Sequence, residues 1–600
     1  MKLVDRKDIA KITKLDKIGM PYLAELLMQI TKLSKVNDFY HRNFNAQGIN
    51  FVDALFSEIE LEYDYYQEEL SRIPKEGAFV TISNHPLGGI DGLMLLKLIT
   101  QIRPDYKVMA NFLLKKIEPI SDYFLSVNPF ENHKDAHSNM QGIKDAMSYI
   151  KAGHGLGTFP AGEVSSLDLE DGKIKDREWQ LPAIKLLRKM QAPIVPVYFK
   201  ARNSRLFYML SLLSPTLQTA KLPSEIFQQR NKSVTVRIGK PILPSEYKDL
   251  SDEETSDLLR ERTYRLSNTL DSDSRFKRMQ QKFSIKPKRQ EKPIAEAQPQ
   301  DKIEHEVEKA LENGRLMTEF RNFQIFCSPA QEIPSILKEI GRLREIAFRE
   351  VGEGTGDSLD LDKFDQTYLH LFLWDKDSNK IAGAYRLGMG ADLYAKNGIE
   401  GFYVRTLFKI DEPAHHMFKQ GLEMGRAFIT KEYQQKPMPL FLLWKGITHV
   451  ILRNPEKVRY LLGGVSISNQ FSRYSKSIMI EFVKRHFYDA EMANAIHPRK
   501  EYKVKLGPLE KAMLDKTTPD DINKFDRYIE DIEPGNMRFP VLLKKYIKQN
   551  AKIVAFNVDP KFNNAVDGLM YIDINDLPEQ TIKPVLEELE NATKENSVER

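Results

Sequence analysis

A histidine and an aspartate six positions apart carry the strongest chemical signal in the sequence. His85 and Asp91 lie in the stretch Ser83-Asn-His-Pro-Leu-Gly-Gly-Ile-Asp-Gly92. An imidazole can take the proton of a hydroxyl group, and a neighbouring carboxylate can fix its tautomer and stabilise the imidazolium. The same two residues can instead cap a turn and a helix. Taken alone, the stretch leaves both interpretations open.

Two predicted elements flank this pair. Residues 78–83 are apolar and β-branched at strand length, whereas residues 84–92 are rich in glycine and proline. From Leu93 onward the sequence is apolar enough for a buried helix. The pattern therefore predicts a histidine at the end of a strand and an aspartate in the first turn of a helix, where the helix dipole favours a carboxylate.

Two further motifs follow. Thr158-Phe-Pro-Ala-Gly-Glu-Val-Ser-Ser166 contains a glycine that lets backbone amides approach a ligand oxygen. Ile194-Val-Pro-Val-Tyr198 indicates a buried strand. Because proline cannot donate a ladder hydrogen bond, Pro196 predicts an edge strand or a bulge.

These three motifs, in this order, resemble the glycerolipid acyltransferase superfamily, which includes lysophosphatidic acid acyltransferases. The resemblance covers about residues 20 to 245. It implies that His85 is the general base on an acceptor hydroxyl and that Asp91 orients it. It also implies that Gly162 and Glu163 bind the acceptor near a thioester donor.

The sequence departs from that family in two places. Five residues separate His85 from Asp91, where the family has four, and a Gly-Gly turn can absorb the extra residue. Ala161 and Val164 occupy the family's Glu and Arg positions. Without an arginine to grip a phosphate, we expect an acceptor other than a glycerol phosphate. The spacing resembles the branch that acylates amino-acid lyso-lipids, often described as haemolysins.

A second ordered set of motifs lies in the C-terminal half. It comprises Asp362-Lys-Phe-Asp365, Ala382-Gly-Ala-Tyr-Arg386 and Glu423-Met-Gly-Arg426. Over about residues 315 to 580 the set resembles the ornithine N-acyltransferases, the branch of the GNAT fold that depends on acyl carrier protein. No Gly-rich pyrophosphate loop precedes residues 415–429, which favours a carrier-protein thioester over coenzyme A.

N-acyl transfer needs a neutral amine, so a carboxylate must take the proton of the ammonium group. Glu423 is the first candidate, on a predicted helix over residues 415–429 that would place Arg426 on the same face. Asp362 and Asp365 can bind the ammonium, and Arg386 or Arg426 the α-carboxylate. The alternative is a surface pair and structural salt bridges.

Composition limits the remaining function classes. The 41% hydrophobic and 29% charged residues are typical of a soluble globular chain, and we find no apolar membrane span and no signal peptide. Its net charge of +5 is too small to indicate nucleic-acid binding. The single Cys327 excludes an internal disulfide and fits a reducing cytoplasm. His133 and His137 do not make a convincing metal site, so no metal and no cofactor are expected.

At 600 residues the chain is too long for one core. We predict an α/β protein with two domains. A glycerolipid-acyltransferase-like α/β layer domain over residues 1–274 precedes a GNAT-like α/β domain with a mixed sheet over residues 303–600. The basic, proline-containing residues 275–302 form the linker.

We expect the protein to act at a membrane surface. Residues 16–42 can form an amphipathic helix lying on a membrane, or equally a helix packed on its own domain. The basic linker can also contact anionic lipid. We expect a cytoplasmic protein, peripheral on the inner face of the cytoplasmic membrane.

The two resemblances together imply a bifunctional acyltransferase. The C-terminal domain would N-acylate an amino acid with a 3-hydroxyacyl chain from acyl carrier protein, and the N-terminal domain would then esterify the 3-hydroxyl of this lyso-lipid. The product would be an aminolipid, with ornithine favoured and glycine second. The alternatives are a lysophospholipid O-acyltransferase fused to an N-acyl amino acid synthase, and a membrane-lytic protein.

Overall fold

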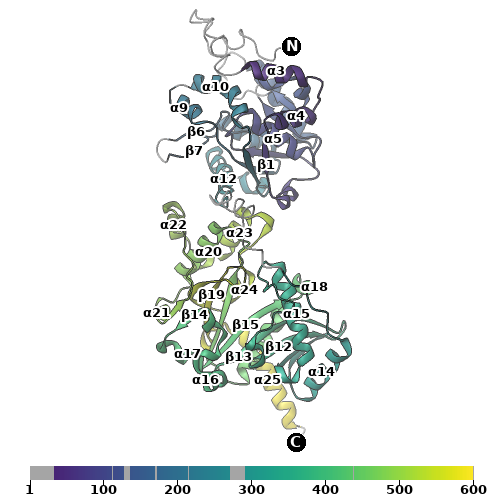
Figure 1. Cartoon of the computed structure of the whole chain (residues 1–600), viewed down its shortest axis with the longest axis vertical. Helices are drawn as coiled ribbons and strands as arrows, with labels where there is room; N and C mark the ends of the chain where they lie inside the picture. Colours follow the sequence, from purple (N-terminus) through teal and green to yellow (C-terminus); the bar gives the residue numbers. More distant parts are fainter. Residues whose placement is uncertain are drawn as a thin grey trace, which may run out of the picture. The chain divides into compact units, whose positions relative to one another are not determined.

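The protein is described by a computed structural model covering residues 33–110, 112–126, 136–168, 172–213, 215–270, 291–436 and 438–598. It forms two compact units (Figure 1). Unit 1 comprises the described residues up to Leu270 together with Asp531–Asn536, and unit 2 the described remainder. Most of the predicted amphipathic helix and of the basic linker lies outside the described residues.

Two ends of those predicted segments are described. Residues 33–42 belong to helix α3 (Leu33–Asn43). At the other end, the backbone N–H groups of Lys292 and Ala295 bind carbonyl groups of unit 2, and helix α14 (Gln300–Glu312) includes the last three residues of the predicted linker. The C-terminal part of that linker is therefore fixed to unit 2.

Unit 1 contains a seven-stranded mixed sheet with β2 and β8 at its centre. β2 pairs in parallel with β5 on one side and with β8 on the other, while β8 pairs antiparallel with β9. The order is β1 (Glu62–Asp64), β9 (Ser233–Ile238), β8 (Ile194–Lys200), β2 (Phe79–Ser83), β5 (Gly155–Thr158), β3 (Lys107–Ala110), β4 (Phe124–Ser126). The strands expected from the sequence are confirmed at these positions.

Helices cover both faces of this sheet. Alternate residues of a strand point to opposite faces, so Phe79 packs in one core and Val80 in the other. The first core lies under α4 (Ile49–Glu58) and α5 (Gly89–Ile99); the second lies under α7 (Ala136–Lys151), α8 (Leu181–Met190) and α12 (Asp252–Arg265). This gives the predicted α/β layer domain.

Pro196 lies in a central strand, so the expectation of an edge strand was wrong, whereas the alternative of a bulge agrees with the pairing. Between the pairs Ile194–Ile242 and Val197–Ile238, two residues of β8 lie opposite three residues. The antiparallel ladder between β8 and β9 begins at Val197, one residue after the proline. The Pro196 carbonyl accepts a hydrogen bond from the N–H of Gly239, 2.7 Å away. The ladder with β9 therefore needs no N–H at this position, which removes the usual obstacle to an internal proline.

Unit 2 contains an eight-stranded mixed sheet. Its order is β10 (Leu316–Phe320), β11 (Phe323–Pro329), β12 (Leu369–Asp375), β13 (Lys380–Met389), β15 (Gly421–Ile429), β16 (Tyr460–Ile467), β19 (Ala565–Asp573), β18 (Lys552–Asp559). Strands β15 and β16 pair in parallel, and all other neighbouring strands of this sheet pair antiparallel. Strands β12 and β13 form an antiparallel hairpin.

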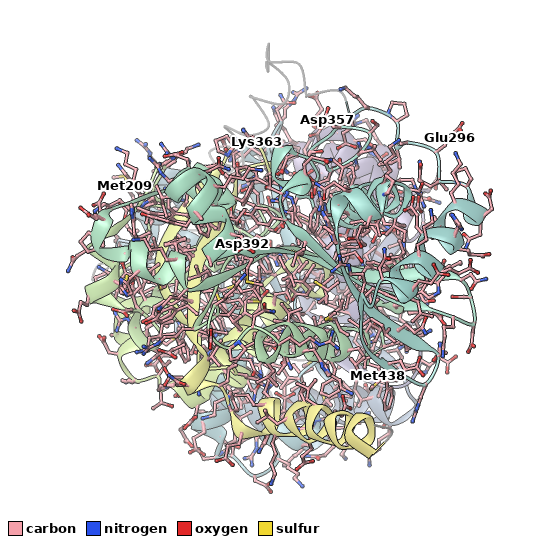
Figure 2. The ribbon with its side chains drawn as sticks, turned by 90° about the horizontal axis from the view of Figure 1, so that it is seen from below. Met209, Glu296, Asp357, Lys363, Asp392 and Met438 are labelled. Carbon is pink, nitrogen blue, oxygen red and sulfur yellow. The ribbon has the colours of Figure 1, made fainter. Side chains whose placement is uncertain are left out.

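Helices also cover both faces of this sheet. Helix α15 (Pro334–Glu350) begins at Pro334 and packs with α14 on Phe326 and Phe372. Helix α19 (Met438–Leu452) covers the opposite face, where Gly446 allows close approach to Ile325. The C-terminal helix α25 (Glu579–Val598), in yellow, lies on the same side as Met438 in Figure 2, and Glu588 pairs with Lys445 and His449 of α19.

The predicted helix over residues 415–429 was wrong. Only His415–Lys419 is helical (α17), and Gly421–Ile429 is the central strand β15. Leu, Glu, Met and Ala favour a helix locally, but pairing with β13 and β16 overrides that weak preference. Position 421 requires glycine, because a Cβ there would lie 2.7 Å from the backbone oxygen of Met417. Glu423 and Arg426 are therefore strand residues and not a helical i, i+3 pair.

Candidate active sites

In unit 1, the side chains of His85 and Asp91 are in contact. Nδ1 of His85 lies 3.1 Å from Oδ2 of Asp91, and Asp91 is fully buried. The His85 side chain is 18% exposed, so part of its ring can be reached from outside. Burial raises the pKa of Asp91, and its hydrogen bond to His85 opposes that rise. This is the geometry of a base and the carboxylate that orients it.

The five-residue spacing is accommodated by the turn before α5. Gly88 is the N-cap of the helix and has φ +77° and ψ −131°, a conformation that glycine adopts readily and other residues rarely do. Oδ2 of Asp91, in the first turn of α5, accepts hydrogen bonds from the N–H groups of Leu87 (2.8 Å) and Gly88 (3.1 Å). The carboxylate therefore closes the turn and holds the imidazole at the same time.

Asp176 links the histidine loop to the Phe-Pro-Ala-Gly-Glu block, and the sequence analysis missed it. Its Oδ1 accepts from the backbone N–H of His85 (3.1 Å) and from the hydroxyl of Ser165 (2.5 Å). In return, the N–H of Ser165 donates to the carbonyl of His85 (2.9 Å). The only signal in the sequence was an aspartate just before Arg177 and Trp179. Its burial and its hydrogen-bond partners become apparent only in the fold.

The Phe-Pro-Ala-Gly-Glu block lies beside the histidine. The Phe159 ring centre is 4.1 Å from that of His85, and Gly162 sits in a turn with φ +71°. Glu163 is half-exposed and lies 3.6 Å from a guanidinium nitrogen of Arg177. The arginine missing from the motif thus has a counterpart in space, supplied from outside the block.

In unit 2, the parallel strands β15 and β16 separate partway along their length. They pair only over Gly421–Met424 against Tyr460–Gly463. Beyond these residues the two strands pair with their outer neighbours, β13 and β19, and not with each other. A Cβ added to Gly425 or Gly464 would meet nothing within 4 Å. The sheet therefore opens at these two glycines, with backbone groups of both strands facing the gap.

Arginines and aspartates form a buried network beside this opening. Arg386 is 1% exposed and lies 2.7 Å from Asp362 and 3.2 Å from Asp365. Arg426 pairs with Asp362 (3.4 Å) and with Asp360 (3.2 Å). The structure thus brings together four of the predicted residues, and adds Asp360 and Arg344, which the sequence analysis missed.

The two aspartates of this network predicted from the sequence differ in solvent exposure. Asp365 is fully buried, contacts Arg344 and Arg386, and accepts a hydrogen bond from the N–H of Asp362 (2.6 Å). The two arginines hold its pKa below the ordinary value even though burial acts to raise it. Asp362 keeps 27% of its side chain exposed. Asp365 therefore positions arginines, and Asp362 is the aspartate of the predicted pair with access to a substrate.

Glu423 is buried and already fully hydrogen-bonded. Its carboxylate accepts from the hydroxyl of Tyr368 and from the N–H groups of Tyr403 (3.1 Å) and Val404 (2.9 Å). Burial raises the pKa of Glu423, and the Tyr368 hydrogen bond opposes the rise. The carboxylate holds the Tyr403–Val404 turn in place. Taking a proton from a substrate would require it to release one of these donors.

Arg426 lies between two aromatic rings. Its guanidinium carbon is 4.6 Å from the centre of the Tyr403 ring and 4.4 Å from that of Phe562. Arg426 has φ +52°, at an irregularity in the ladder between β13 and β15. No group of three potential ligands suited to a metal ion occurs in the described part of the chain, and His133 lies outside it.

Comparison with known proteins finds a similar family for part of each unit. Residues 20–273 match the family model described as acyltransferase, and residues 343–444 match the acetyltransferase (GNAT) domain. A glycine N(alpha)-acyltransferase of Bacteroides thetaiotaomicron is 34% identical over 192 residues, 30% of this chain. The corresponding protein of Phocaeicola vulgatus is 28% identical over 43% of the chain. A lyso-glycine lipid O-acyltransferase of Bacteroides thetaiotaomicron is 28% identical over 40% of the chain.

The matches cover 57%, 81% and 87% of these three relatives, respectively. A solved CoA-dependent acyl-homoserine lactone synthase aligns with 44% of the chain and 87% of its own length, with 9% identity and a TM-score of 0.23, too low to support an argument. The chain is thus similar to two kinds of acyl-transfer domain, to an acyltransferase family over residues 20–273 and to the GNAT acetyltransferase domain over residues 343–444.

Proposed function

We propose that the protein makes a diacylated amino-acid lipid in two steps. The GNAT domain transfers a 3-hydroxyacyl chain from acyl carrier protein to the amine of an amino acid. The acyltransferase domain then transfers a second chain to the 3-hydroxyl of the resulting lyso-lipid. The observation that carries the proposal is that one chain matches both kinds of acyl-transfer family model and also resembles relatives named for each of these two steps.

The first unit has the groups that O-acylation requires. His85, oriented by Asp91, takes the proton of the acceptor hydroxyl as its oxygen attacks the thioester carbonyl. Gly162 and Glu163 line the acceptor side of this site, and Arg177 offers a cation to the carboxylate of an amino-acid head group. An acceptor with a carboxylate head group is consistent with a motif that has no arginine to bind a phosphate.

The second unit has a strand opening and a buried pair of arginines. The thioester would lie along the gap that starts at Gly425 and Gly464, where backbone N–H groups can bind its carbonyl oxygen. Arg386 and Arg426 are the candidates for the α-carboxylate of the amino acid. The donor is proposed as acyl carrier protein, since no Gly-rich pyrophosphate loop precedes β15.

We propose glycine as the head group. Sequence resemblance alone favoured ornithine, but the relatives are named for glycine and for lyso-glycine lipid. Ornithine remains the competing head group, and it differs by a second ammonium group. Supplying purified protein with either amino acid and measuring N-acyl product separates the two.

We further propose that the protein works on a membrane surface. Among the described residues no helix is long and apolar enough to cross a bilayer. Helix α9 (Arg205–Leu213) carries three exposed apolar side chains, Leu206, Met209 and Leu212, which are 52%, 63% and 49% exposed. Arg202 and Arg205 are exposed beside them, which suits an anionic phospholipid surface at the inner face of the cytoplasmic membrane.

This apolar face is linked to the catalytic loop. The side-chain amide of Asn203, just before α9, donates to the carbonyl of Pro86 (3.0 Å), next to His85. Helix α10 (Pro215–Gln228) carries Leu222, which lies under Gly88 of the same loop. A bilayer touching α9 would therefore present a lyso-lipid near the histidine.

Lipid profiling by mass spectrometry, after expression in a host that makes no aminolipid, tests the proposal. The wild-type chain should yield the diacyl product, and His85→Ala should accumulate the mono-acylated lyso-lipid. His416→Ala, at an exposed histidine in the other unit, is the control and should behave as wild type. Full diacyl product from His85→Ala would contradict the assignment.

Two other functions remain testable in the same experiment. Re-acylation of ordinary lysophospholipid by unit 1, with release of an N-acyl amino acid by unit 2, would give mono-acyl product from the wild type as well. A membrane-lytic protein would release a dye from liposomes even as the His85→Ala variant, whereas lysis that needs His85 would indicate an enzyme.

A further inference from the structure

We infer that Asp567 and Asp559 form the binding site for the amine in unit 2, and that Asp567 takes the proton of the bound ammonium group. The inference rests on the proposed N-acyl transfer and assigns its amine site. It concerns a cluster of carboxyl groups on the far side of the strand opening from Glu423.

Three carboxyl groups gather on one face of the unit 2 sheet. Asp567 of β19 lies opposite Ser466 of β16 and opposite Asn557 of β18. Asp559 follows Asn557 by two residues and therefore points to the same face. Glu353 reaches this face from the segment after α15, where its Oε2 accepts from the hydroxyl of Ser466 (2.7 Å).

Two of these carboxylates have unused acceptor capacity. Asp559 is 2% exposed; its Oδ1 accepts from the N–H of Lys561 (2.8 Å), but Oδ2 has no hydrogen-bond partner among the described residues. Asp567 forms no hydrogen bond or ion pair with any residue in the described ranges. Leaving the buried Oδ2 of Asp559 without a donor is costly, and an ammonium group supplies three donors. Asp567 is partly exposed, so a ligand can reach it.

The cluster lies where the amine must meet the thioester. Ser466 follows Gly464, the glycine at the strand opening, by two residues, and Asp567 is directly across from Ser466. Arg426 follows Gly425, the other glycine of the opening, and its guanidinium packs on Phe562 of the loop that joins Asp559 to Asp567. An amino acid with its carboxylate on Arg426 thus places its amine towards these aspartates.

The surroundings of Asp567 suit a proton acceptor. Burial raises its pKa well above the ordinary value, and the carboxylates of Asp559 and Glu353 raise it further, whereas Arg426 opposes the rise. An ordinary carboxylate is too weak a base for an ammonium group, and a raised pKa narrows that difference. Glu423 has its hydrogen-bonding capacity taken up by Tyr368, Tyr403 and Val404, and acts as a positioning residue.

The step balances without any further reactant. The ammonium group passes one proton to the Asp567 carboxylate and becomes a neutral amine. The amine nitrogen attacks the thioester carbonyl carbon, the C–N bond forms and the C–S bond breaks. The second proton lost by the nitrogen leaves with the sulfur as a thiol, and Asp567 returns its proton to solvent.

The test uses the purified full-length chain, 3-hydroxyacyl carrier protein and glycine, with thiol release as the readout. Asp567→Asn should lower kcat/KM for glycine about 10²- to 10⁴-fold, the range typical of losing a general base. It should leave O-acylation of supplied lyso-lipid unchanged, and a cooperative melting transition of unit 2 should show that the mutated unit is folded. Asp573→Asn is the matched control on the same strand, since Asp573 pairs with Arg459 away from the cluster. Asp567→Asn within threefold of wild type would overturn the inference.

A second variant tests the cluster through pH. Glu353→Gln can keep the hydrogen bond from Ser466 while removing one negative charge beside Asp567. The pKa of Asp567 should fall, so the rising limb of the pH–rate profile should move to lower pH. An unmoved limb would count against the inference.

Binding separates this inference from the proposed function. Calorimetry of glycine with the full chain should show binding that Asp567→Asn weakens at least tenfold. Glycine binding that depends on Asp567, without any acyl transfer by the wild type, would refute the proposed function and leave the amine site in place. N-acyl transfer that persists in Asp567→Asn would refute the amine site and leave the proposed function in place.

Discussion

Arg177 places a guanidinium nitrogen 3.6 Å from the carboxylate of Glu163, although it follows Glu163 by fourteen positions in the sequence. The short hairpin of β6 (Ser166–Leu167) and β7 (Ile174–Lys175) brings the two together. Both side chains are about 40% exposed, so water screens the pair and its contribution to stability is small. The arginine is therefore available to a carboxylate on the acceptor.

Replacing Arg177 with alanine should weaken acceptor binding in the O-acyl step. We expect KM for lyso-glycine lipid to rise about tenfold, the effect of losing one charge-assisted hydrogen bond, with a smaller change in kcat. Steady-state kinetics with purified lyso-lipid measures both. The exposed Arg42→Ala substitution is the control, and an unchanged KM in Arg177→Ala would remove the residue from the acceptor site.

Asp91→Asn should separate orientation from folding. The asparagine oxygen can still accept from Leu87 and Gly88, but it cannot stabilise an imidazolium at His85. We expect O-acylation to fall roughly 10³- to 10⁴-fold, as in other carboxylate–histidine pairs. Because burial makes the charged Asp91 costly, the melting temperature should not fall. Retention of more than a tenth of the rate would show that Asp91 only caps the helix.

Gly88→Ala tests the explanation of the five-residue spacing. The φ of +77° is strained for alanine, and its Cβ would lie 2.9 Å from Leu222. We expect a loss of about 1–3 kcal/mol of unfolding free energy together with reduced O-acylation. Gly92→Ala, which meets its neighbours at 3.8 Å or more, should be tolerated. Equal stability of the two variants in denaturant titrations would refute the explanation.

The apolar face of α9 should govern binding to vesicles. Changing Leu206, Met209 and Leu212 together to serine should lower partitioning onto anionic phospholipid vesicles by about tenfold or more, because buried apolar area drives such binding. Co-sedimentation measures the bound fraction. Leu509→Ser, at a side chain that is 78% exposed in unit 2, serves as the control. If the triple variant binds as wild type, another surface contacts the membrane.

Asp567→Asn should stabilise the protein at alkaline pH. The folded-state pKa of Asp567 lies above its unfolded value, so its contribution to stability is present below the unfolded pKa and is lost as pH rises through the folded pKa. Asparagine removes this loss. Unit 2 of the variant should therefore melt at a higher temperature than wild type at about pH 8, and the difference should shrink towards about pH 4. Calorimetric melts at both values, with Asp573→Asn as control, would show whether the shift is specific.

The alternation of strands and helices in the first half followed from the sequence, because short β-branched runs and apolar helices differ in length and in their flanking turns. The same pattern identified β2, the strand that precedes His85. It failed at Gly421–Ile429, where helix-favouring residues pair with two strands distant in sequence. The prediction of an edge strand at Pro196 failed for a related reason, since only the register with β9 shows that the missing N–H of the proline is not needed.

The sequence by itself determined the local chemistry: a histidine and an aspartate joined by a glycine turn, and a glycine-containing block that follows a strand. These act within a few residues, so their spacing is enough to predict them. Tertiary structure decided which distant charges meet. Asp176 joins two motifs, Arg177 reaches Glu163, and Asp559, Asp567 and Glu353 converge beside Arg426. Strand register and burial create these groupings, and neither can be deduced from residue order alone.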